Sequence, residues 1–395
     1  MLDKLSAEGL ITQLADRSGE ALRAIRQQAV EERNGPKSMP RFTTSVAAGL
    51  VGRTASAIGF AEKEGRLPEV ERTGTGRRVG YTTGDLNKMR EIFGTRPWRS
   101  PEDPCAIIAV QNFKGGVAKT TLSAHLAQYC ATKGYRTCLV DCDSQASSTT
   151  LFGYYPDFDL SEDDTIYPFL REKDRPDLRY ALRETNWDGL YLIPANLRLY
   201  SAEYELAAEV SRGSPALLDR LARGIRSISS DFDVIILDPP PALGTISLSV
   251  MRAANALLIP LPPTVMDFSS TASFLSMLGE TMEVLRENGL PLDLSWIKFV
   301  FSRVDDQKSM QKMILGLIRK LYGDAVCRAM MRDSAEIDNA TGRLMTVYEL
   351  DQPATSRDTH NRCVTQLNAV NAEIELEIRK MWPSHADRLV TEGLV

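Results

Sequence analysis

The chain has 395 residues, a length that fits two folding units better than a single core. Its 43% hydrophobic and 25% charged residues are close to the average of globular proteins, and no apolar run reaches the roughly 18 residues that a bilayer span needs. Because residues 1–8 also mix charged with apolar side chains, the sequence excludes a signal peptide and predicts a cytoplasmic protein.

The net charge of −5 is unevenly distributed along the chain. Residues 1–100 hold 17 Lys and Arg against 12 Asp and Glu, a balance of +5 that leaves −10 for the remainder. A basic N-terminal part favours a polyanion such as DNA as its partner. The six cysteines form no C-x-x-C pair, so they predict buried, reduced thiols and neither a zinc site nor a redox site.

Two breaks in the pattern define a helical arm, a head, a linker and a main domain. Residues 1–40 are predicted to form a helical arm, because Leu and Ile recur at helical spacing before the breaker sequence at 34–40. Residues 95–104 contain three prolines and indicate a linker. The segment between them, 41–94, is predicted to be a separate head, and 105–395 the main domain.

The head shows the pattern of a helix-turn-helix. A short helix is followed by a turn at Gly52 and by a second helix that Thr54 caps and Gly65 ends. The small core between the helices is expected to consist of Val46, Ala47, Leu50, Ile58 and Phe60. In such a motif the N-terminal residues of the second helix reach base edges in the major groove. The expected base-contacting residues are Arg53, Ser56 and Ala57.

A hairpin with a glycine-rich basic tip is predicted over 70–81, followed by a helix over 83–93. This order resembles the winged helix-turn-helix of MerR-like heads, in which Arg77 and Arg78 would lie along phosphates. A helical hairpin that makes dimer contacts remains the alternative, because helix-turn-helix patterns are weak signals in a single sequence.

The main domain alternates short apolar runs with segments of helix length. The runs are 106–110, 137–141, 190–193, 234–238, 256–261 and 297–301. This alternation predicts an α/β fold with a largely parallel, doubly wound sheet of the P-loop NTPase type, covered by helices on both faces.

A phosphate-binding loop is predicted between the first apolar run and a helix that begins near Lys119. Backbone N–H groups of the turn would cradle the phosphates of ATP, Lys119 would reach the β- and γ-phosphates, and the Thr120 hydroxyl would reach Mg²⁺. The predicted nucleotide-contacting residues are Lys114, Gly115, Gly116, Val117, Ala118, Lys119, Thr120 and Thr121.

The loop departs from the usual G-x-x-x-x-G-K-[ST] pattern. Phe113 and Ala118 stand where its two glycines belong, and a second lysine, Lys114, begins the loop. Two ammonium groups so close would repel each other unless a polyphosphate lies between them. The doubled lysine is therefore itself an argument for a phosphate ligand.

Acidic residues end two later strands. Asp141 and Asp143 follow the second apolar run and are expected on the same side of an extended chain. Asp238 ends the fourth run in the Walker B arrangement, which holds Mg²⁺ through water. Thr120, Asp143 and Asp238 are therefore the candidate metal-site residues.

The set K-G-G-x-x-K-T-T, D-x-D and a later strand Asp resembles the ParA/MinD superfamily of deviant Walker ATPases over about residues 104–382. The resemblance implies a homodimer that sandwiches two ATP molecules, with Lys114 reaching the partner's phosphates and Asp143 orienting the attacking water. With its N-terminal head, the chain is most similar to large partition ATPases of low-copy plasmids, especially the RepA group of RepABC-type replicons. That likeness implies a ParB- or RepB-type centromere-binding partner, operator and nonspecific DNA, and a slow, partner-stimulated ATPase.

The resulting hypothesis is a nucleoid-associated ATPase that partitions plasmid DNA and represses its own operon through its head. The alternatives are a nucleotide-responsive repressor with no partitioning role and a MinD-like ATPase that cycles on membranes. The latter would need a basic amphipathic C-terminal helix, whereas residues 382–395 carry little positive charge. Redox chemistry of the nitrogenase iron-protein kind finds no support in the cysteine positions.

An amphipathic helix is predicted within 303–322. At 100° per residue, Met310, Met313, Ile314, Leu317, Ile318 and Leu321 gather on one side. Lys308, Lys312 and Arg319 gather on the other side and are the candidate residues for nonspecific DNA, with Arg328 and Arg332 next. A merely solvated face is the other interpretation of this basic stripe.

Overall fold

The computed structural model describes residues 6–32, 37–67, 70–76, 78–156, 158–171, 175–212 and 215–395. The chain divides into two compact units, Met1–Ser38 and Met39–Val395. The first unit contains one long helix, α1 (Ala7–Glu32), which confirms the predicted helix of the arm. Along α1 the side chains of Ile11, Leu14, Leu22 and Ile25 are exposed.

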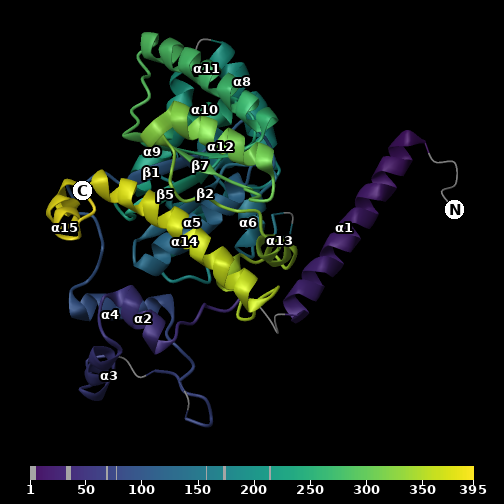
Figure 1. Ribbon diagram of the computed structural model, residues 1–395. Coiled ribbons are helices and arrows are strands. Elements are labelled where there is room, and N and C mark those ends of the chain that lie inside the picture. The colour runs from purple at the N-terminus through teal and green to yellow at the C-terminus, as the bar shows by residue number, and fades with distance from the viewer. Residues whose placement is uncertain are drawn as a thin grey trace. The chain divides into compact units, whose positions relative to one another are not determined.

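A seven-stranded sheet is the centre of the second unit (Figure 1). Its order is β3-β4-β2-β5-β1-β6-β7, and every neighbouring pair is parallel except β3 with β4. The strands are β1 (Ala106–Val110), β2 (Thr137–Asp141), β3 (Arg183–Glu184), β4 (Leu190–Ile193), β5 (Val234–Asp238), β6 (Ala256–Leu261) and β7 (Trp296–Phe301). All six predicted runs are strands, and only the two-residue edge strand β3 went unpredicted.

Both faces of the sheet are buried, as its continuous apolar strands require. Along β1 the side chains of Ile107 and Ala109 join one core cluster, and those of Ile108 and Val110 join the other. The helices at 119–133 and 357–380 cover the second face, and five helices between residues 198 and 322 cover the first (Figure 1). The six cysteines are buried and free, as predicted.

The helices of the main domain have the following bounds: α5 (Lys119–Lys133), α6 (Ser147–Leu151), α7 (Tyr167–Arg171), α8 (Arg198–Ser211), α9 (Asp219–Ile228), α10 (Thr245–Ala253), α11 (Val265–Glu287), α12 (Ser309–Tyr322), α13 (Ala335–Gly342), α14 (Arg357–Lys380) and α15 (Ala386–Thr391). Short 3-10 turns are η1 (Glu162–Asp164), η2 (Arg179–Ala181), η3 (Pro215–Leu218), η4 (Gly323–Ala325), η5 (Val347–Glu349) and η6 (Pro383–His385). Among the described residues, no helix combines the length and apolar character that a membrane crossing requires.

Three helices form the head: α2 (Thr44–Val51), α3 (Ala55–Lys63) and α4 (Thr83–Phe93). Gly52 ends α2 in the left-handed conformation, and the Thr54 hydroxyl accepts a hydrogen bond from the Ala57 amide at the start of α3, as the sequence predicted. An isolated antiparallel bridge pairs Arg72 with Arg78 in the predicted hairpin.

The core of the head differs from the prediction at two positions. Val46 and Phe60 are 49% and 58% exposed, so both were wrongly assigned to it. The helical period explains the exposure of Phe60. Ile58 and Ala61 are three residues apart and share the inner face of α3, whereas Phe60, two residues after Ile58, points to another side of the helix. The space is filled instead by residues from α4 and the hairpin, including Leu86, Met89 and Tyr81.

The segment 95–104 lacks regular secondary structure, as predicted, but it is bound to the main domain along its length. The Trp98 indole donates to the Gly134 carbonyl at 2.9 Å, and its ring lies between the guanidinium groups of Arg96 and Arg136. Arg99 donates to the carbonyls of Phe232 and Ser229. These bonds fix the position where the head joins the main domain.

Candidate nucleotide site

The carboxyl ends of β1, β2 and β5 meet at one edge of the sheet, where ligands bind in folds of this class. Register pairs Asp141 at the end of β2 with Asp238 at the end of β5. The predicted phosphate loop leaves β1, which pairs with the other side of β5. Sheet topology thus brings the loop and both carboxylates together.

The backbone of the loop contains two left-handed residues, Gly116 with φ of 74° and Ala118 with φ of 73°. The first is a glycine, which adopts this conformation freely, whereas alanine pays about 1–2 kcal/mol for it. Ala118 is also the N-cap of α5, and its methyl group cannot accept a hydrogen bond from the first turn. The amides of that turn are therefore left for an anion.

Lys119 is buried, with 7% of its surface exposed, and its Nζ donates to the Lys114 carbonyl at 3.3 Å. Burial lowers the pKa of Lys119, while the carboxylates of Asp238 and Asp143 oppose the change. A desolvated ammonium forms strong charge-assisted hydrogen bonds with a phosphate.

Lys114 lies at the outer side of the loop. Its Nζ is 2.6 Å from Oδ1 of Asp267, in the first turn of α11; the lysine side chain is 42% exposed and that of Asp267 only 12%. The ion pair with Asp267 gives the charge of Lys114 a partner within its own chain. Because Lys114 is half-exposed, it can leave Asp267 for another anion.

Asp238 is buried, and hydroxyl groups donate hydrogen bonds to its carboxylate. Its carboxylate accepts hydrogen bonds from Ser123 at 3.2 Å and from Ser148 at 2.8 Å. Burial raises the pKa of Asp238, and hydrogen bonds from Ser148 and Thr120 together with the charge of Lys119 act in the opposite direction.

Asp141 and Asp143 have separate surroundings despite their spacing. Asp141 is buried and accepts from the amide and hydroxyl of Thr149 at 2.8 and 2.7 Å, which ties α6 to the end of β2. Burial and the nearby Asp238 charge raise the pKa of Asp141 to about 8. Asp143 is only partly buried, and its Oδ1 accepts from the Gln145 amide at 2.9 Å. Asp143 is thus the more accessible of the two to a water molecule.

The donor set fits Mg²⁺ bound to a nucleotide. The described residues contain no cluster of three or more His, Cys, Asp or Glu that could hold a metal without help. Mg²⁺ commonly takes one or two protein ligands and completes its shell with water and phosphate oxygens. Thr120 and Asp238, which lie within hydrogen-bonding reach of each other, provide such a partial site.

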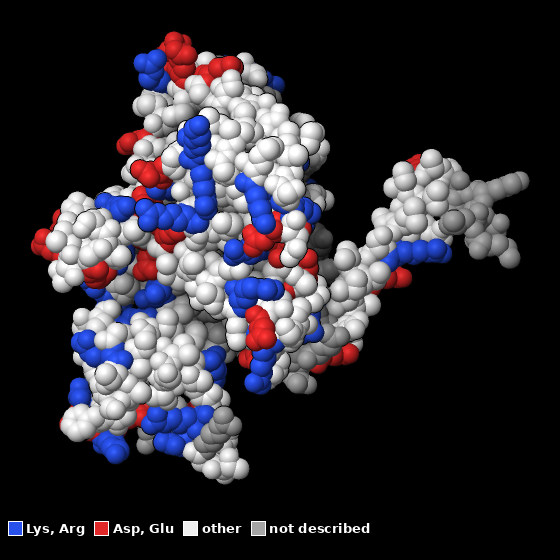
Figure 2. Space-filling view, viewed as in Figure 1, with Lys and Arg blue, Asp and Glu red and all other residues white. Residues whose placement is uncertain are grey.

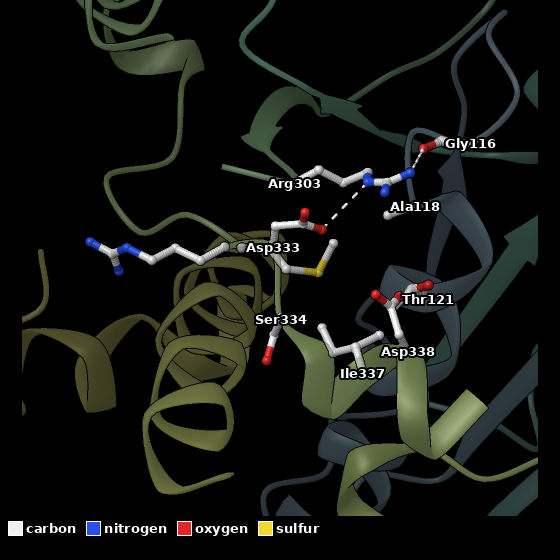
Figure 3. Close-up of a pocket in the computed structure, with 10 residues that line it drawn as sticks. Gly116, Ala118, Thr121, Arg303, Asp333, Ser334, Ile337 and Asp338 are labelled. Atoms are coloured by element: carbon white, nitrogen blue, oxygen red, sulfur yellow. Dashed lines mark hydrogen bonds and ion pairs between the residues drawn. The ribbon is translucent and has the colours of Figure 1, made fainter. Parts of the chain in front are cut away.

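A pocket of about 200 Å³ adjoins the outer side of the loop (Figure 3). Arg303, just after β7, lies between the loop and Asp333: its Nη1 donates to the Gly116 carbonyl at 3.3 Å, and its Nε is 3.6 Å from Asp333 Oδ1. The pocket is lined by Gly116, Ala118, Thr121, Arg303, Met331, Arg332, Asp333, Ser334, Ile337 and Asp338. The pocket therefore shares Gly116, Ala118 and Thr121 with the loop and the first turn of α5.

Comparison with known proteins agrees with this geometry. A family model described as an AAA domain matches residues 105–288. The chain is 31% identical over 389 residues to a provisionally named replication protein A of Sinorhizobium fredii, with 95% of each chain covered. It is 34% identical over 372 residues to protein SopA of Escherichia coli K12, covering 91% of this chain and 94% of SopA. The chain belongs to the ParA/MinD superfamily.

Solved structures share the fold of this ParA-type chain. A structure described as a partition protein has a TM-score of 0.67 at 21% identity and covers 94% of this chain and 99% of its own. Cobyrinic acid a,c-diamide synthase of Mycobacterium smegmatis, solved with an ATP analogue and magnesium, has a TM-score of 0.51 at 26% identity. That match covers 62% of this chain and 91% of the synthase.

The residues of the ParA-type site that were not predicted from the sequence include Asp267, Ser123, Ser148 and Arg303. Thr264 and Asp267 form an N-capping pattern that indicates only a helix start, and the Thr264 hydroxyl does accept from the Asp267 amide. The contacts of Asp267 and Arg303 with the loop, and of Ser148 with Asp238, join segments that are far apart in the chain. Local spacing in the sequence does not reveal such contacts.

The candidate DNA-contacting residues of the head differ in availability. Arg53 donates to the carbonyls of Phe93 and Gly52, and its side chain is therefore held at the end of α4. Arg78 pairs with Glu62 and donates to Tyr81, so it would have to leave Glu62 to reach a phosphate. Ser56 is exposed, Ala57 is partly exposed, and Arg77 lies outside the described residues.

The helix predicted within 303–322 is α12, and it buries less than its apolar pattern suggested. Among its apolar side only Ile314 and Ile318 are buried, and Met310, Met313, Leu317 and Leu321 are each more than 40% exposed. β7 is the edge strand of the sheet, so the sheet covers only a narrow stripe of the surface of α12. Lys308 pairs with Asp305, Arg319 donates to the Arg328 carbonyl, and Lys312 is exposed.

Proposed function

We propose that this protein is an ATP-dependent DNA-partitioning ATPase that dimerises when it binds ATP and Mg²⁺. The observation that carries the proposal is the pair of lysines on one phosphate loop. Lys119 is buried beside Asp238, where it can hold the phosphates of its own nucleotide. Lys114 is half-exposed on the outside of the loop, where it can reach the nucleotide of a second subunit.

Different residues of the site bind the phosphates, hold Mg²⁺ and orient the attacking water. The loop amides and Lys119 bind the phosphates, and the Thr120 hydroxyl and Asp238 hold the bound Mg²⁺. When bound, Mg²⁺ neutralises charge that develops on the β- and γ-phosphate oxygens. Asp143, the more accessible carboxylate beside Lys119, orients the attacking water. Size-exclusion chromatography with ADP, with ATP, and with ATP plus random duplex tests this cycle, since only ATP should produce the dimer.

Lys114→Ala is expected to bind ATP as a monomer and to fail in dimerisation. The phosphate that Lys114 contacts belongs to the other subunit, and its nearest anion within its own chain is Asp267. Light scattering with saturating ATP measures the dimer, and titration with a fluorescent nucleotide measures binding. Lys133→Ala, a lysine at the far end of α5, is the control. An ATP-dependent dimer of normal stability in Lys114→Ala would refute the assignment.

We further propose that α12 contributes to nonspecific DNA binding by the ATP dimer. Figure 2 shows Lys and Arg side chains over the region of α12 and α14, with acidic side chains between them. Lys312 is exposed, whereas Lys308 and Arg319 already have partners, so Lys312 should contribute most. Two subunits would place two such stripes on one assembly, which would explain why DNA binding requires ATP.

Replacing Lys312 with alanine should weaken the salt dependence of binding to random duplex. The slope of log binding constant against log salt concentration should decrease in magnitude by about 1 per subunit. The measurement uses the ATP-loaded full chain and duplex without an operator, across a series of salt concentrations. Arg286→Ala on α11 is the matched control, since Arg286 is exposed but lies on another helix. Equal slopes for the two variants would move the DNA site elsewhere, with Arg328 and Arg332 the next candidates.

A ParB- or RepB-type protein is proposed as the partner of the ATPase. The head is proposed to bind the operator as a winged helix-turn-helix. Its helix order, caps and hairpin support this proposal. A MinD-like membrane cycle is not favoured, because two relatives that match over more than 90% of the chain are a replication protein A and SopA.

A further inference from the structure

The phosphate loop is held from the outside by two residues that follow β7. A loop that turns its amides inward to a phosphate turns its carbonyls outward, where donors can hold them. Ser302 Oγ donates to the Val117 carbonyl at 2.8 Å, and Arg303 Nη1 donates to the Gly116 carbonyl at 3.3 Å. Two consecutive peptide groups of the loop therefore accept from two consecutive residues elsewhere in the chain.

Ser302 and Arg303 are themselves held firmly enough to act as donors. Ser302 is completely buried, and its amide donates to the Leu261 carbonyl at the end of β6. Arg303 has a φ of 52°, a left-handed conformation that residues other than glycine rarely adopt. Its guanidinium lies between the loop and Asp333, as Figure 3 shows.

The planarity of the peptide bond turns these two hydrogen bonds into control of the amides. In a trans peptide the carbonyl and the following N–H point in opposite directions. Holding the Gly116 carbonyl outward therefore directs the Val117 amide inward, and holding the Val117 carbonyl directs the Ala118 amide inward. The direction of both amides is thus influenced by side chains that bond to the carbonyl side of the same peptide groups.

We infer that Ser302 and Arg303 are positioning residues, which preorganise the phosphate loop by fixing the peptide groups at 116–117 and 117–118. This inference rests on the proposed nucleotide-binding function and names two residues that no phosphate-loop pattern contains. Preorganised amides bind an anion more tightly, because no free energy is lost in reorienting them on binding. Arg303 has a second role as a wall of the adjoining pocket, whereas Ser302 does not line it.

The two roles can be separated with a ligand that has phosphates but no base. Ser302→Ala should weaken inorganic tripolyphosphate and ATP by the same factor, about tenfold, since it removes one hydrogen bond from the loop. Arg303→Ala should weaken tripolyphosphate about as much and ATP more, because the pocket also loses a wall. Arg303→Lys should recover part of the tripolyphosphate affinity, since an ammonium can still donate to the Gly116 carbonyl.

Calorimetric titration of the full chain with Mg²⁺ and each ligand gives the affinities, and thermal unfolding without ligand shows that each variant is folded. Arg286→Ala on α11 is the control, because Arg286 is an exposed arginine that does not line the pocket. Arg303 is half-exposed, so its variant should fold even where Ser302→Ala does not. Unchanged tripolyphosphate affinity in the folded variants would overturn the inference. A wild-type chain that binds neither ligand would instead refute the nucleotide function.

Discussion

Lys119→Ala is expected to weaken ATP binding by at least about 100-fold, the factor that corresponds to losing roughly 3 kcal/mol of charge-assisted hydrogen bonding. The physical reason is the burial of Lys119, which strips water from the ammonium and leaves phosphate as its best available partner. The variant also leaves the buried Asp238 without the nearest positive charge. Titration of the purified chain with a fluorescent ATP analogue measures the loss.

Two further variants show which step has failed. Asp143→Ala should bind ATP and dimerise normally but lose hydrolysis by about 100-fold or more, because it removes the group that orients water. Lys133→Ala should behave as wild type, since this lysine stands at the other end of the same helix. Affinity within threefold of wild type for Lys119→Ala would be incompatible with the loop as the phosphate site. Normal hydrolysis by Asp143→Ala would remove Asp143 from catalysis.

The second large effect is expected at Arg90, a buried arginine of α4 with 1% of its surface exposed. Its Nη2 donates to the Leu50 carbonyl at 3.1 Å and to the Thr132 carbonyl at 2.5 Å, and its Nη1 donates to Asn87 at 2.8 Å. Leu50 lies in the last turn of α2, and Thr132 in the last turn of α5. One guanidinium therefore links a helix of the head to the helix that follows the phosphate loop.

The charge of Arg90 is balanced by carbonyl groups at the ends of two helices. Carbonyls at a helix C-terminus carry partial negative charge, which favours a cation there. Burial lowers the pKa of Arg90 to about 10, so the group remains protonated at neutral pH. The guanidinium also packs against Gly134, where an added Cβ would lie 2.7 Å from Nη1.

Arg90→Met should reduce the free energy of unfolding by about 3 kcal/mol, because two buried carbonyls lose their donor while the packing volume is roughly kept. Urea denaturation followed by the fluorescence of Trp98 and Trp187 measures this loss. Arg90→Lys should recover only part of it, since a single ammonium cannot reproduce the planar fork. Lys88→Met, an exposed position on the same helix, is the control. If Arg90→Met and Lys88→Met unfold at the same urea concentration, Arg90 does not join the head to the main domain.

Local patterns in the sequence were sufficient for the elements. Strands such as β1 and β5 are buried on both faces and therefore appear as continuous apolar runs, and Thr54 marks the start of α3 by its own capping bond. The phosphate loop was equally local, since its glycines and lysines lie within eight residues. Val46 and Phe60 were misassigned because an apolar residue on a short helix can face either way.

The sequence by itself determined the order of strands along the chain, the nucleotide loop and the acids at the strand ends, because each depends on neighbours within one turn or one strand. Only the tertiary structure decided which distant groups complete the site. Asp267 pairs with Lys114, Ser148 donates to Asp238, and Ser302 holds the Val117 carbonyl. These contacts arise from the order of strands across the sheet, where β6 lies beside β1 and β7 beside β6 although many residues separate these strands from β1 in the chain. Short-range periodicity carries no information about such neighbours, and packing of the whole sheet sets them.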